Sequence, residues 1–310
     1  MAAQSGVSCV TVFGGSGFLG SEIVTRLAAA GLKTKVAVRN PDRVQPAGPA
    51  DGAGEILSVY ADVRDETTVA RALEGADAAV NAVGLYVEHG AESFEQVHEL
   101  GALNVAHQCA RSGVRRLVHI SGIGADMRSA SAYVRARAKG ELLVADVFPP
   151  AAILRPSVIF GPGDRFLNTF ARIARTSPVL PLFGRGGTRL QPVYVADVAG
   201  AVHGALSGAD TEGRTYELGG PGVYSYRDLI AMVLHRAGLR RLLVPVPFAV
   251  WDLLAAIASV LPGPPLTPAQ VTLMKQDNVV ADGALSLETL GVTPTSLEDV
   301  LPLYGFSPTR

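Results

Sequence analysis

The feature that most constrains the fold is a glycine-rich stretch near the N-terminus, residues 14–20. It follows the apolar run 7–13 and precedes a segment with helical apolar spacing, so we expect the glycines to join a strand to a helix. Glycines allow a sharp turn and close approach of a ligand, and the N–H groups at the start of a helix attract anions. The spacing Gly15-x-Gly17-x-x-Gly20 therefore predicts a site for the diphosphate of a dinucleotide.

Strand and helix patterns alternate from this stretch to about residue 160. The expected strands are 7–13, 35–38, 55–60, 76–81 and 117–120, and a helix is expected at 94–111. This alternation predicts right-handed crossovers and an α/β fold with a doubly wound parallel sheet. Two further strands, 151–154 and 188–194, are expected to extend the sheet. We expect residues 1–164 to form a dinucleotide-binding domain, to which 188–218 return, and residues 165–310 to form a smaller C-terminal lobe that closes over the ligand.

Composition excludes several functional classes. The chain has 310 residues, 48% of them hydrophobic and 18% charged, and its net charge is -1, which gives no strong field for binding nucleic acid. Cys9 and Cys109 lie far apart, and the histidines form no ligand motif, so we expect buried thiols and no metal site. Arginine far outnumbers lysine, which is typical of GC-rich bacterial genes. The chain reaches its first expected strand within a few residues, so we expect no signal peptide and a cytoplasmic protein.

Two arginines follow the second expected strand, about 20 residues past the glycines. Proteins that select NAD usually carry an acid here to hold the ribose 2′-hydroxyl, whereas this chain carries Arg39, with Arg43 close behind. A guanidinium can hold a 2′-phosphate through paired hydrogen bonds. The pattern therefore favours NADPH over NADH; the alternative is that both arginines are solvated surface residues.

Four further stretches carry a family resemblance: residues 97–102, 113–121, 160–168 and 191–198. Together with the spacing Gly14-x-x-Gly17-x-x-Gly20, they resemble an atypical branch of the short-chain dehydrogenase/reductase superfamily. That branch contains the nucleotide-binding accessory subunit of mitochondrial respiratory complex I and its bacterial relatives. The resemblance covers residues 7–220 and implies a Rossmann fold of the extended type, which holds NADPH tightly in a largely structural role. It also implies a partner, respiratory complex I or another membrane-associated assembly, and a place beside the cytoplasmic face of the inner membrane.

The resemblance assigns cofactor-binding residues to the glycine turn and to the ends of the following strands. In this branch the pair Asp62-Val63 receives the adenine, and the small residues after the fourth strand let a flat ligand pass above the sheet. The expected cofactor-binding residues are Gly14, Gly15, Ser16, Gly17, Phe18, Leu19, Gly20, Arg39, Arg43, Asp62, Val63, Ala82, Val83, Gly84, Ser121, Tyr133, Arg137 and Pro156.

The catalytic residues of the superfamily are only partly present. Its reductases use a Tyr, a Lys four residues later on the same helical face, and a Ser at the end of the fifth strand; the ammonium lowers the pKa of the phenol. Here Tyr133 is followed by Arg137, and Gly122 stands at the second hydroxyl position, which leaves Ser121. Lys139 lies roughly 120° around the helix from the Tyr and cannot replace the missing Lys.

Two functions therefore remain open. The first is an NADPH-binding protein of the complex I accessory type with a structural or stabilising role. The second is an NADPH-dependent oxidoreductase or epimerase-like enzyme, with Tyr133, Arg137 and Ser121 as its catalytic groups and a small carbonyl, quinone-related or nucleotide-sugar substrate. His98 stands where many sugar-nucleotide enzymes of the superfamily carry Asn.

An apolar helix bounded by prolines is expected at residues 248–261. It is shorter than the roughly 20 residues that a membrane span needs, so we expect no transmembrane segment. One interpretation is a helix packed within the small lobe. The other is a helix that docks on a membrane surface or a partner, because Phe248 and Trp251 suit an interface, although it lacks the basic face of most such helices.

Overall fold

A computed structural model describes residues 6–43, 53–259 and 266–306. Residues 260–261 of the expected helix 248–261 lie outside the described residues. The described chain divides into two units. The first holds the residues up to Pro156, together with Val195–Leu218 and Asp282–Thr293; the second holds Ser157–Tyr194, Gly219–Ala281 and the residues from Pro294 onward. This division differs from the expected domains in placing 157–164 and 188–194 in the second unit and 282–293 in the first.

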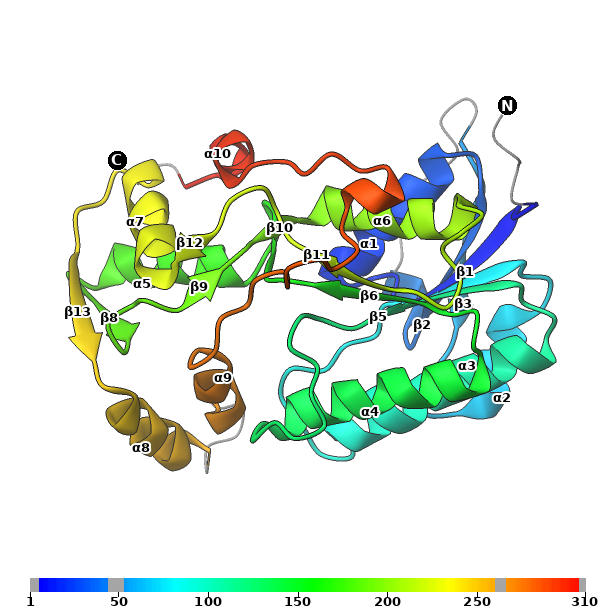
Figure 1. The fold of residues 1–310 in the computed structure, drawn as a ribbon, viewed down its shortest axis with the longest axis horizontal. Helices are drawn as coiled ribbons and strands as arrows, with labels where there is room; N and C mark the ends of the chain where they lie inside the picture. The colour runs from blue at the N-terminus through cyan, green and yellow to red at the C-terminus, as the bar shows by residue number, and fades with distance from the viewer. Residues whose placement is uncertain (1–5, 44–52, 260–265, 307–310) are drawn as a thin grey trace. The chain divides into compact units, whose positions relative to one another are not determined.

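The first unit contains a seven-stranded parallel sheet with the strand order β11-β6-β5-β4-β1-β2-β3, which confirms the doubly wound α/β fold (Figure 1). The strands are β1 (Cys9–Phe13), β2 (Lys33–Val38), β3 (Ile56–Tyr60), β4 (Ala78–Asn81), β5 (Arg116–Ile120), β6 (Ala152–Pro156) and β11 (Thr215–Leu218). All five residues of β1 are buried, as expected for a central parallel strand covered on both faces.

Helices cover both faces of this sheet (Figure 1). On one face lie α2 (Glu66–Leu73), α3 (Gly101–Arg111) and α4 (Ala132–Val147); on the other lie α1 (Phe18–Ala29) and α6 (Val195–Ser207). The expected helix 94–111 forms as a π-helical turn, Glu95–Leu100, which continues into α3.

One expectation about the sheet is wrong. Residues 188–194 do not join it; they form β9 (Arg189–Leu190) and β10 (Val193–Tyr194), which pair with short strands of the second unit. Pro192 separates the two and cannot donate a ladder hydrogen bond, so the run cannot continue as one strand. The strand beside β6 is instead β11.

Strand register brings the sequence-predicted residues to one edge of the sheet. Phe13 lies opposite both Ala37 of β2 and Asn81 of β4, and Asn81 lies opposite His119 of β5. The chain therefore leaves four neighbouring parallel strands at the same level, which is where such sheets bind ligands.

The second unit is built from short strand pairs and helices. Its strands are β7 (Ile159–Phe160) with β10, β8 (Val179–Phe183) with β13 (Leu242–Val246), and β12 (Tyr224–Ser225) with β9. Its helices are α5 (Phe166–Thr176), α7 (Tyr226–Arg236), α8 (Phe248–Ala258), α9 (Pro268–Leu273) and α10 (Leu297–Val300). Fully buried Tyr226, Leu182 and Phe160 anchor the core of this unit.

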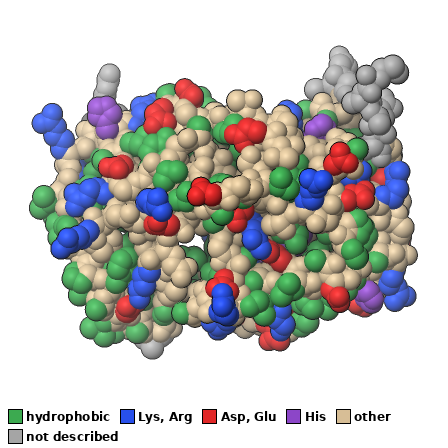
Figure 2. Space-filling model, in the orientation of Figure 1, with side chains coloured by type: hydrophobic (Ala, Val, Ile, Leu, Met, Phe, Trp, Pro, Cys, Tyr) green, Lys and Arg blue, Asp and Glu red, His purple; other side chains and the backbone are tan. Residues whose placement is uncertain are grey.

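Helix α8 presents a different face from the one expected. Trp251 stacks on Phe183 with ring centroids 4.4 Å apart and donates from Nε1 to the carbonyl oxygen of Leu182, while Phe248 packs against Gly184. Both aromatic side chains thus contact the β8 segment, and neither is among the exposed large hydrophobic residues. The outward face is aliphatic, and Figure 2 shows hydrophobic side chains over α8 at the lower left. It consists of Val250, Leu253, Leu254 and Ile257, spaced at i, i+3, i+4 and i+7, with Leu253 61% and Ile257 60% exposed. We call these four residues the α8 stripe.

Among the helices of the described residues, none combines the length and the apolar character required to cross a membrane.

Candidate functional site

The glycine turn has the geometry that a phosphate-binding turn needs. Gly14 has φ +78°, and a Cβ there would lie 2.9 Å from the carbonyl oxygen of Ala82. A Cβ on Gly20 would lie 2.1 Å from the carbonyl oxygen of Gly14, so only glycine lets α1 start this close to β1. Gly17 is the N-cap of α1, and no side chain caps this helix end. Its first N–H groups, including those of Phe18 and Leu19, are therefore available to an anion beside exposed Ser16.

Small residues after β4 lie against this turn. Contact between Gly14 and Ala82 places the two segments together, and a Cβ on Gly84 would meet nothing within 4 Å. The Val83 N–H donates to Oδ1 of Asn81, at 3.2 Å, and the Asn81 side chain lies 3.4 Å from Nδ1 of His119. On this side of the turn, the backbone at Gly84 borders open space. The Asn81 side chain, through its contacts with Val83 and His119, holds the segment in place.

Charged groups gather beyond the ends of β2 and β3. Arg39 forms an ion pair with Glu92, and the Asp62 carboxylate accepts hydrogen bonds from Arg64 at 2.9 Å and 2.5 Å. The hydrogen bond from Arg64 lowers the pKa of Asp62, and Arg39 adds to this effect. Sequence reasoning missed Glu92 and Arg64; the latter directly follows the Asp62-Val63 pair, which could have drawn attention to it.

Val63 is buried, and its side chain lies against Gly101 at the start of α3. Arg43 ends a 3-10 turn, Pro41–Arg43, and its side chain lies outside the described residues.

Tyr133 lies in the first turn of α4 and meets Arg137 one turn later. Nη1 of Arg137 donates to the phenol oxygen at 3.1 Å. The rings of Tyr86, Phe94 and His98 surround the phenol at centroid distances of 5.6, 5.5 and 5.4 Å. Burial raises the pKa of Tyr133 and outweighs the opposing effect of Arg137. The phenol therefore stays protonated at neutral pH and can donate a proton but not accept one.

Arg137 also fills the space above the end of β5. A Cβ on Gly122 would lie 1.9 Å from Nη2 of Arg137, so the guanidinium occupies the position that a hydroxyl side chain would need. The buried Ser121 Oγ has no hydrogen-bond partner in the described part of the chain. Ile123 donates its N–H to the carbonyl oxygen of Pro156, which ties this loop to the end of β6. Lys139 instead pairs with Glu99 at 2.6 Å, away from the phenol.

Buried His119 and partly buried His98 lie next to these groups and are uncharged at neutral pH. Nε2 of His98 lies 2.9 Å from the carbonyl oxygen of Leu85. Burial lowers the pKa of His98 to about 4 and that of His119 to about 3, and the charge of Arg137 acts in the same direction. Across residues 6–43, 53–259 and 266–306, no group of three or more His, Cys, Asp or Glu side chains could hold a metal ion.

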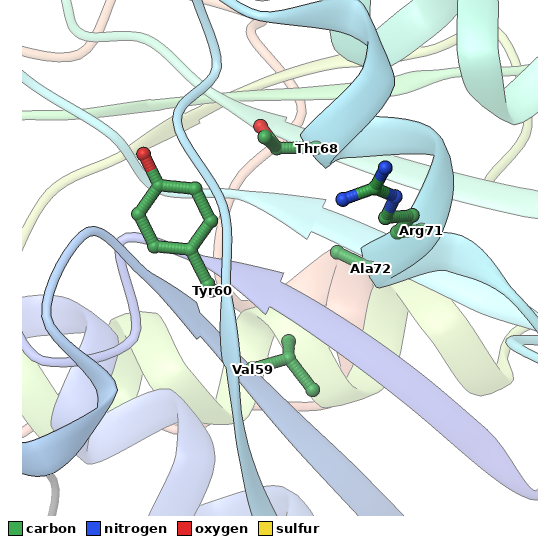
Figure 3. Close-up of a pocket in the computed structure, with 5 residues that line it drawn as sticks. All are labelled: Val59, Tyr60, Thr68, Arg71 and Ala72. Atoms are coloured by element: carbon green, nitrogen blue, oxygen red, sulfur yellow. The ribbon is translucent and has the colours of Figure 1, made fainter.

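A cavity of about 300 Å³ lies between β3 and α2, apart from these groups. Figure 3 shows Val59 and Tyr60 coming from β3, and Thr68, Arg71 and Ala72 coming from α2. None of the residues expected to bind a cofactor lines it, so it gives no support to the cofactor site.

Comparisons with known proteins agree with this arrangement. Residues 10–219 match the model of the NAD dependent epimerase/dehydratase family. The chain is 31% identical to NADH dehydrogenase (ubiquinone) 1 alpha subcomplex subunit 9, mitochondrial, from Arabidopsis thaliana, over 93% of this chain and 75% of the relative. It is 32% identical to a ceramide reductase from Caulobacter vibrioides over 61% of this chain and 58% of that protein. The fold matches the structure of MoeE5 in complex with UDP-glucose and NAD with a TM-score of 0.71, 19% identity, and coverage of 95% of this chain and 96% of that one.

Proposed function

This chain belongs to the NAD dependent epimerase/dehydratase family, and on that premise we propose that it holds NADPH in a structural or stabilising role. The proposed nucleotide site lies in the first unit, at the carboxyl ends of β1, β2, β4 and β5. There the glycine turn and the uncapped N-terminus of α1 would hold the diphosphate. Arg39 would hold the 2′-phosphate, and the backbone of Ala82–Gly84 would border the flat parts of the ligand. When bound, the cofactor supplies hydride chemistry to enzymes of this kind.

The observation that carries the structural role is the position of Arg137. Its guanidinium contacts the Tyr133 phenol and fills the space beside Gly122 where a substrate-orienting hydroxyl would stand. A guanidinium is permanently protonated, so it cannot relay a proton as a lysine does. The phenol also has a raised pKa. These residues are suited to holding ribose hydroxyls in place, and they lack a group that could return a proton to the phenol.

We further propose that the partner is a respiratory NADH dehydrogenase assembly. The Arabidopsis relative is by its name a subunit of that enzyme. The α8 stripe offers an exposed aliphatic surface for such contact. Helix α8 carries one charged residue, Asp252, which pairs with Lys275 at 2.8 Å, and no Lys or Arg. Because helices that bind anionic lipid usually have a basic face, this surface suits a protein partner better than a lipid bilayer.

The test of the nucleotide and its role uses the purified full-length chain. We expect denaturation at neutral pH, which preserves the acid-labile reduced nucleotides, to release about one NADPH per chain, identified by chromatography against NADPH, NADP, NADH and NAD. Incubation of the intact protein with ketones, quinones and nucleotide sugars should leave the bound NADPH unreacted. Multiple turnover with any of these would overturn the structural role, and release of no nicotinamide nucleotide, together with no binding of an added one, would overturn the site.

The choice between NADPH and NADH is tested by Arg39→Asp. A charge-assisted hydrogen bond contributes ~1.5–3 kcal/mol, so NADPH affinity should fall by about tenfold to a hundredfold. NADH affinity, measured by the same calorimetric titration, should change by less than about threefold. Equal losses for both nucleotides would refute the assignment of the 2′-phosphate to Arg39.

One observation favours a second function, an NADPH-dependent reductase. Tyr133 stands in the first turn of α4 with its phenol protonated, and a protonated phenol can donate to the oxygen of a carbonyl as it is reduced. The Caulobacter relative is by its name a reductase of ceramide. Steady-state oxidation of NADPH by a long-chain ketone, abolished by Tyr133→Phe, would establish this function in place of the structural one.

A further inference from the structure

The ion pair between Arg39 and Glu92 joins two segments that are distant in the sequence. Arg39 follows the end of β2, and Glu92 lies at the end of the segment 85–92, which follows β4. The side chain of Arg39 is 57% exposed and that of Glu92 is 29% exposed. The guanidinium expected to hold a phosphate is therefore already paired with a carboxylate of this chain.

Several contacts hold segment 85–92 in place, so the position of the Glu92 carboxylate is well defined. At its start, Leu85 is bound through its carbonyl oxygen to Nε2 of His98, at 2.9 Å. At its end, His89 and Glu92 exchange two backbone hydrogen bonds of 3.0 Å. Between them, Glu88 accepts a hydrogen bond of 2.8 Å from the N–H of Phe94.

The sheet order shows what this segment reaches across. Strand β1 lies between β2 and β4, and all three are parallel. A contact from the segment after β4 to the residue after β2 therefore spans the carboxyl end of β1. That is where the glycine turn begins, beside the N-terminus of α1.

Glu92 belongs to a group of two carboxylates and two guanidiniums. Asp62 is already bound to Arg64 through both of its oxygens, which leaves Glu92 as the carboxylate in contact with Arg39. The hydrogen bond that Arg64 donates to Asp62 raises the pKa of Arg64, and the charge of Glu92 adds to this effect. A phosphate that arrives at Arg39 must replace the Glu92 carboxylate or share the guanidinium with a like charge.

We propose that Glu92 is a specificity-determining residue that competes with the 2′-phosphate for Arg39 and so reduces the preference of this site for NADPH over NADH. The inference rests on the proposed nucleotide site. NADH, which has no 2′-phosphate, leaves the ion pair intact, whereas NADPH must break it. The carboxylate of Glu92 is thus the counterpart of Arg39 in setting the ratio of the two affinities.

The test is Glu92→Gln, measured by calorimetric titration of the full-length, nucleotide-free chain with NADPH and with NADH. Glutamine keeps the size of the side chain and removes its charge. Because partly exposed ion pairs are weak, we expect NADPH affinity to rise by about threefold to fivefold at low salt and NADH affinity to change by less than twofold. The gain should shrink as salt screens the charges.

Two controls separate this effect from a general change of charge. Glu95→Gln removes an exposed carboxylate nearby whose charge acts on Lys139, and it should leave both affinities unchanged. In an Arg39→Ala background, Glu92→Gln should no longer raise NADPH affinity, because there is then no guanidinium for the carboxylate and the phosphate to compete for.

The outcomes distinguish this inference from the function on which it rests. If Glu92→Gln leaves NADPH binding unchanged, or raises NADPH and NADH binding equally, the proposed role of Glu92 is overturned. The nucleotide site itself still stands in that case. The same holds if the gain persists without Arg39. Binding of neither nucleotide by the unmodified chain overturns both.

Discussion

The guanidinium of Arg137 lies where a side chain on Gly122 would have to be: a Cβ there would stand 1.9 Å from Nη2 and 2.6 Å from Cζ. The two residues therefore form one arrangement. The absence of a side chain at 122 makes room for the guanidinium, and the guanidinium, held against the Tyr133 phenol at 3.1 Å, fills that room. Restoring either position alone to the reductase pattern should leave the other out of place.

A double-mutant cycle measures this dependence. The guanidinium of Arg137 is at the end of a flexible side chain, so in Gly122→Ser it can move away. It then loses its hydrogen bond to the buried phenol of Tyr133. We expect a loss of about 1 kcal/mol in the free energy of unfolding, measured with urea. In an Arg137→Lys background the same substitution should cost clearly less. Gly84→Ala, where a Cβ meets nothing within 4 Å, is the control and should cost little. An equal cost for Gly122→Ser in both backgrounds would show that the two positions are independent.

We expect some glycines of the turn to be needed for folding and others for nucleotide binding. In Gly20→Ala the new Cβ meets the backbone oxygen of Gly14 at 2.1 Å, a contact that no rotamer can relieve, so stability should fall by about 3 kcal/mol. In Gly17→Ala the nearest atom is 3.3 Å away, and the nucleotide-free chain should lose less than about 1 kcal/mol. Its NADPH affinity should nevertheless fall at least about tenfold, because the methyl group stands at the expected diphosphate. Retention of full affinity by Gly17→Ala would place the diphosphate elsewhere.

Partly buried His98 should make stability dependent on pH in the mildly acidic range. Its pKa is lowered from 6.5 to about 4 by burial, so the unfolded chain binds a proton between these values that the folded chain does not. The stabilisation is therefore complete above pH 6.5 and is lost as pH falls toward 4. Between pH 6.5 and pH 5, one such group accounts for a loss of about 2 kcal/mol.

His98→Gln isolates this contribution, because the amide can still donate to the carbonyl oxygen of Leu85 but does not titrate. Urea unfolding at pH 6.5 and pH 5 should show a smaller loss for this variant than for the unmodified chain, by about 2 kcal/mol. Exposed His89→Gln should show the same loss as the unmodified chain. Parallel pH dependence in all three proteins would mean that His98 is protonated in the folded state.

Local sequence patterns were sufficient to predict β1 to β6 and the edge of the sheet at which we propose the nucleotide site. The apolar runs that became β1, β2, β3, β4 and β5 are each bounded by polar or glycine residues, and alternation with helices left few possible topologies. The same patterns predicted where the chain would turn at Gly14 and where Arg39 would stand. All of these features depend on residues close together in the sequence.

What the sequence could not predict depends on contacts between distant residues. Arg39 and Glu92 are 53 positions apart, and Glu92 lies in a loop with no periodicity, so nothing local indicated their pairing. The run 188–194 has the composition of a strand, but Pro192 and its partners in the second unit divide it. In α8, apolar residues occur all round the helix, so the pattern could not tell that Trp251 faces β8 and Leu253 faces outward.

The α8 stripe supports a last prediction, which concerns the partner. Leu253 is 61% exposed, so Leu253→Asp should change the free energy of unfolding by less than about 0.5 kcal/mol. If the stripe contacts an apolar surface of a respiratory complex, a buried, unpaired carboxylate would oppose the contact. Co-sedimentation of the full-length protein with purified respiratory complex I should then be lost. Leu303→Asp, equally exposed but outside α8, should co-sediment normally. Normal co-sedimentation of the Leu253 variant would exclude the stripe as the contact surface. Flotation of the unmodified chain with anionic liposomes alone would favour a lipid surface. The absence of Lys and Arg from α8 argues against that second outcome.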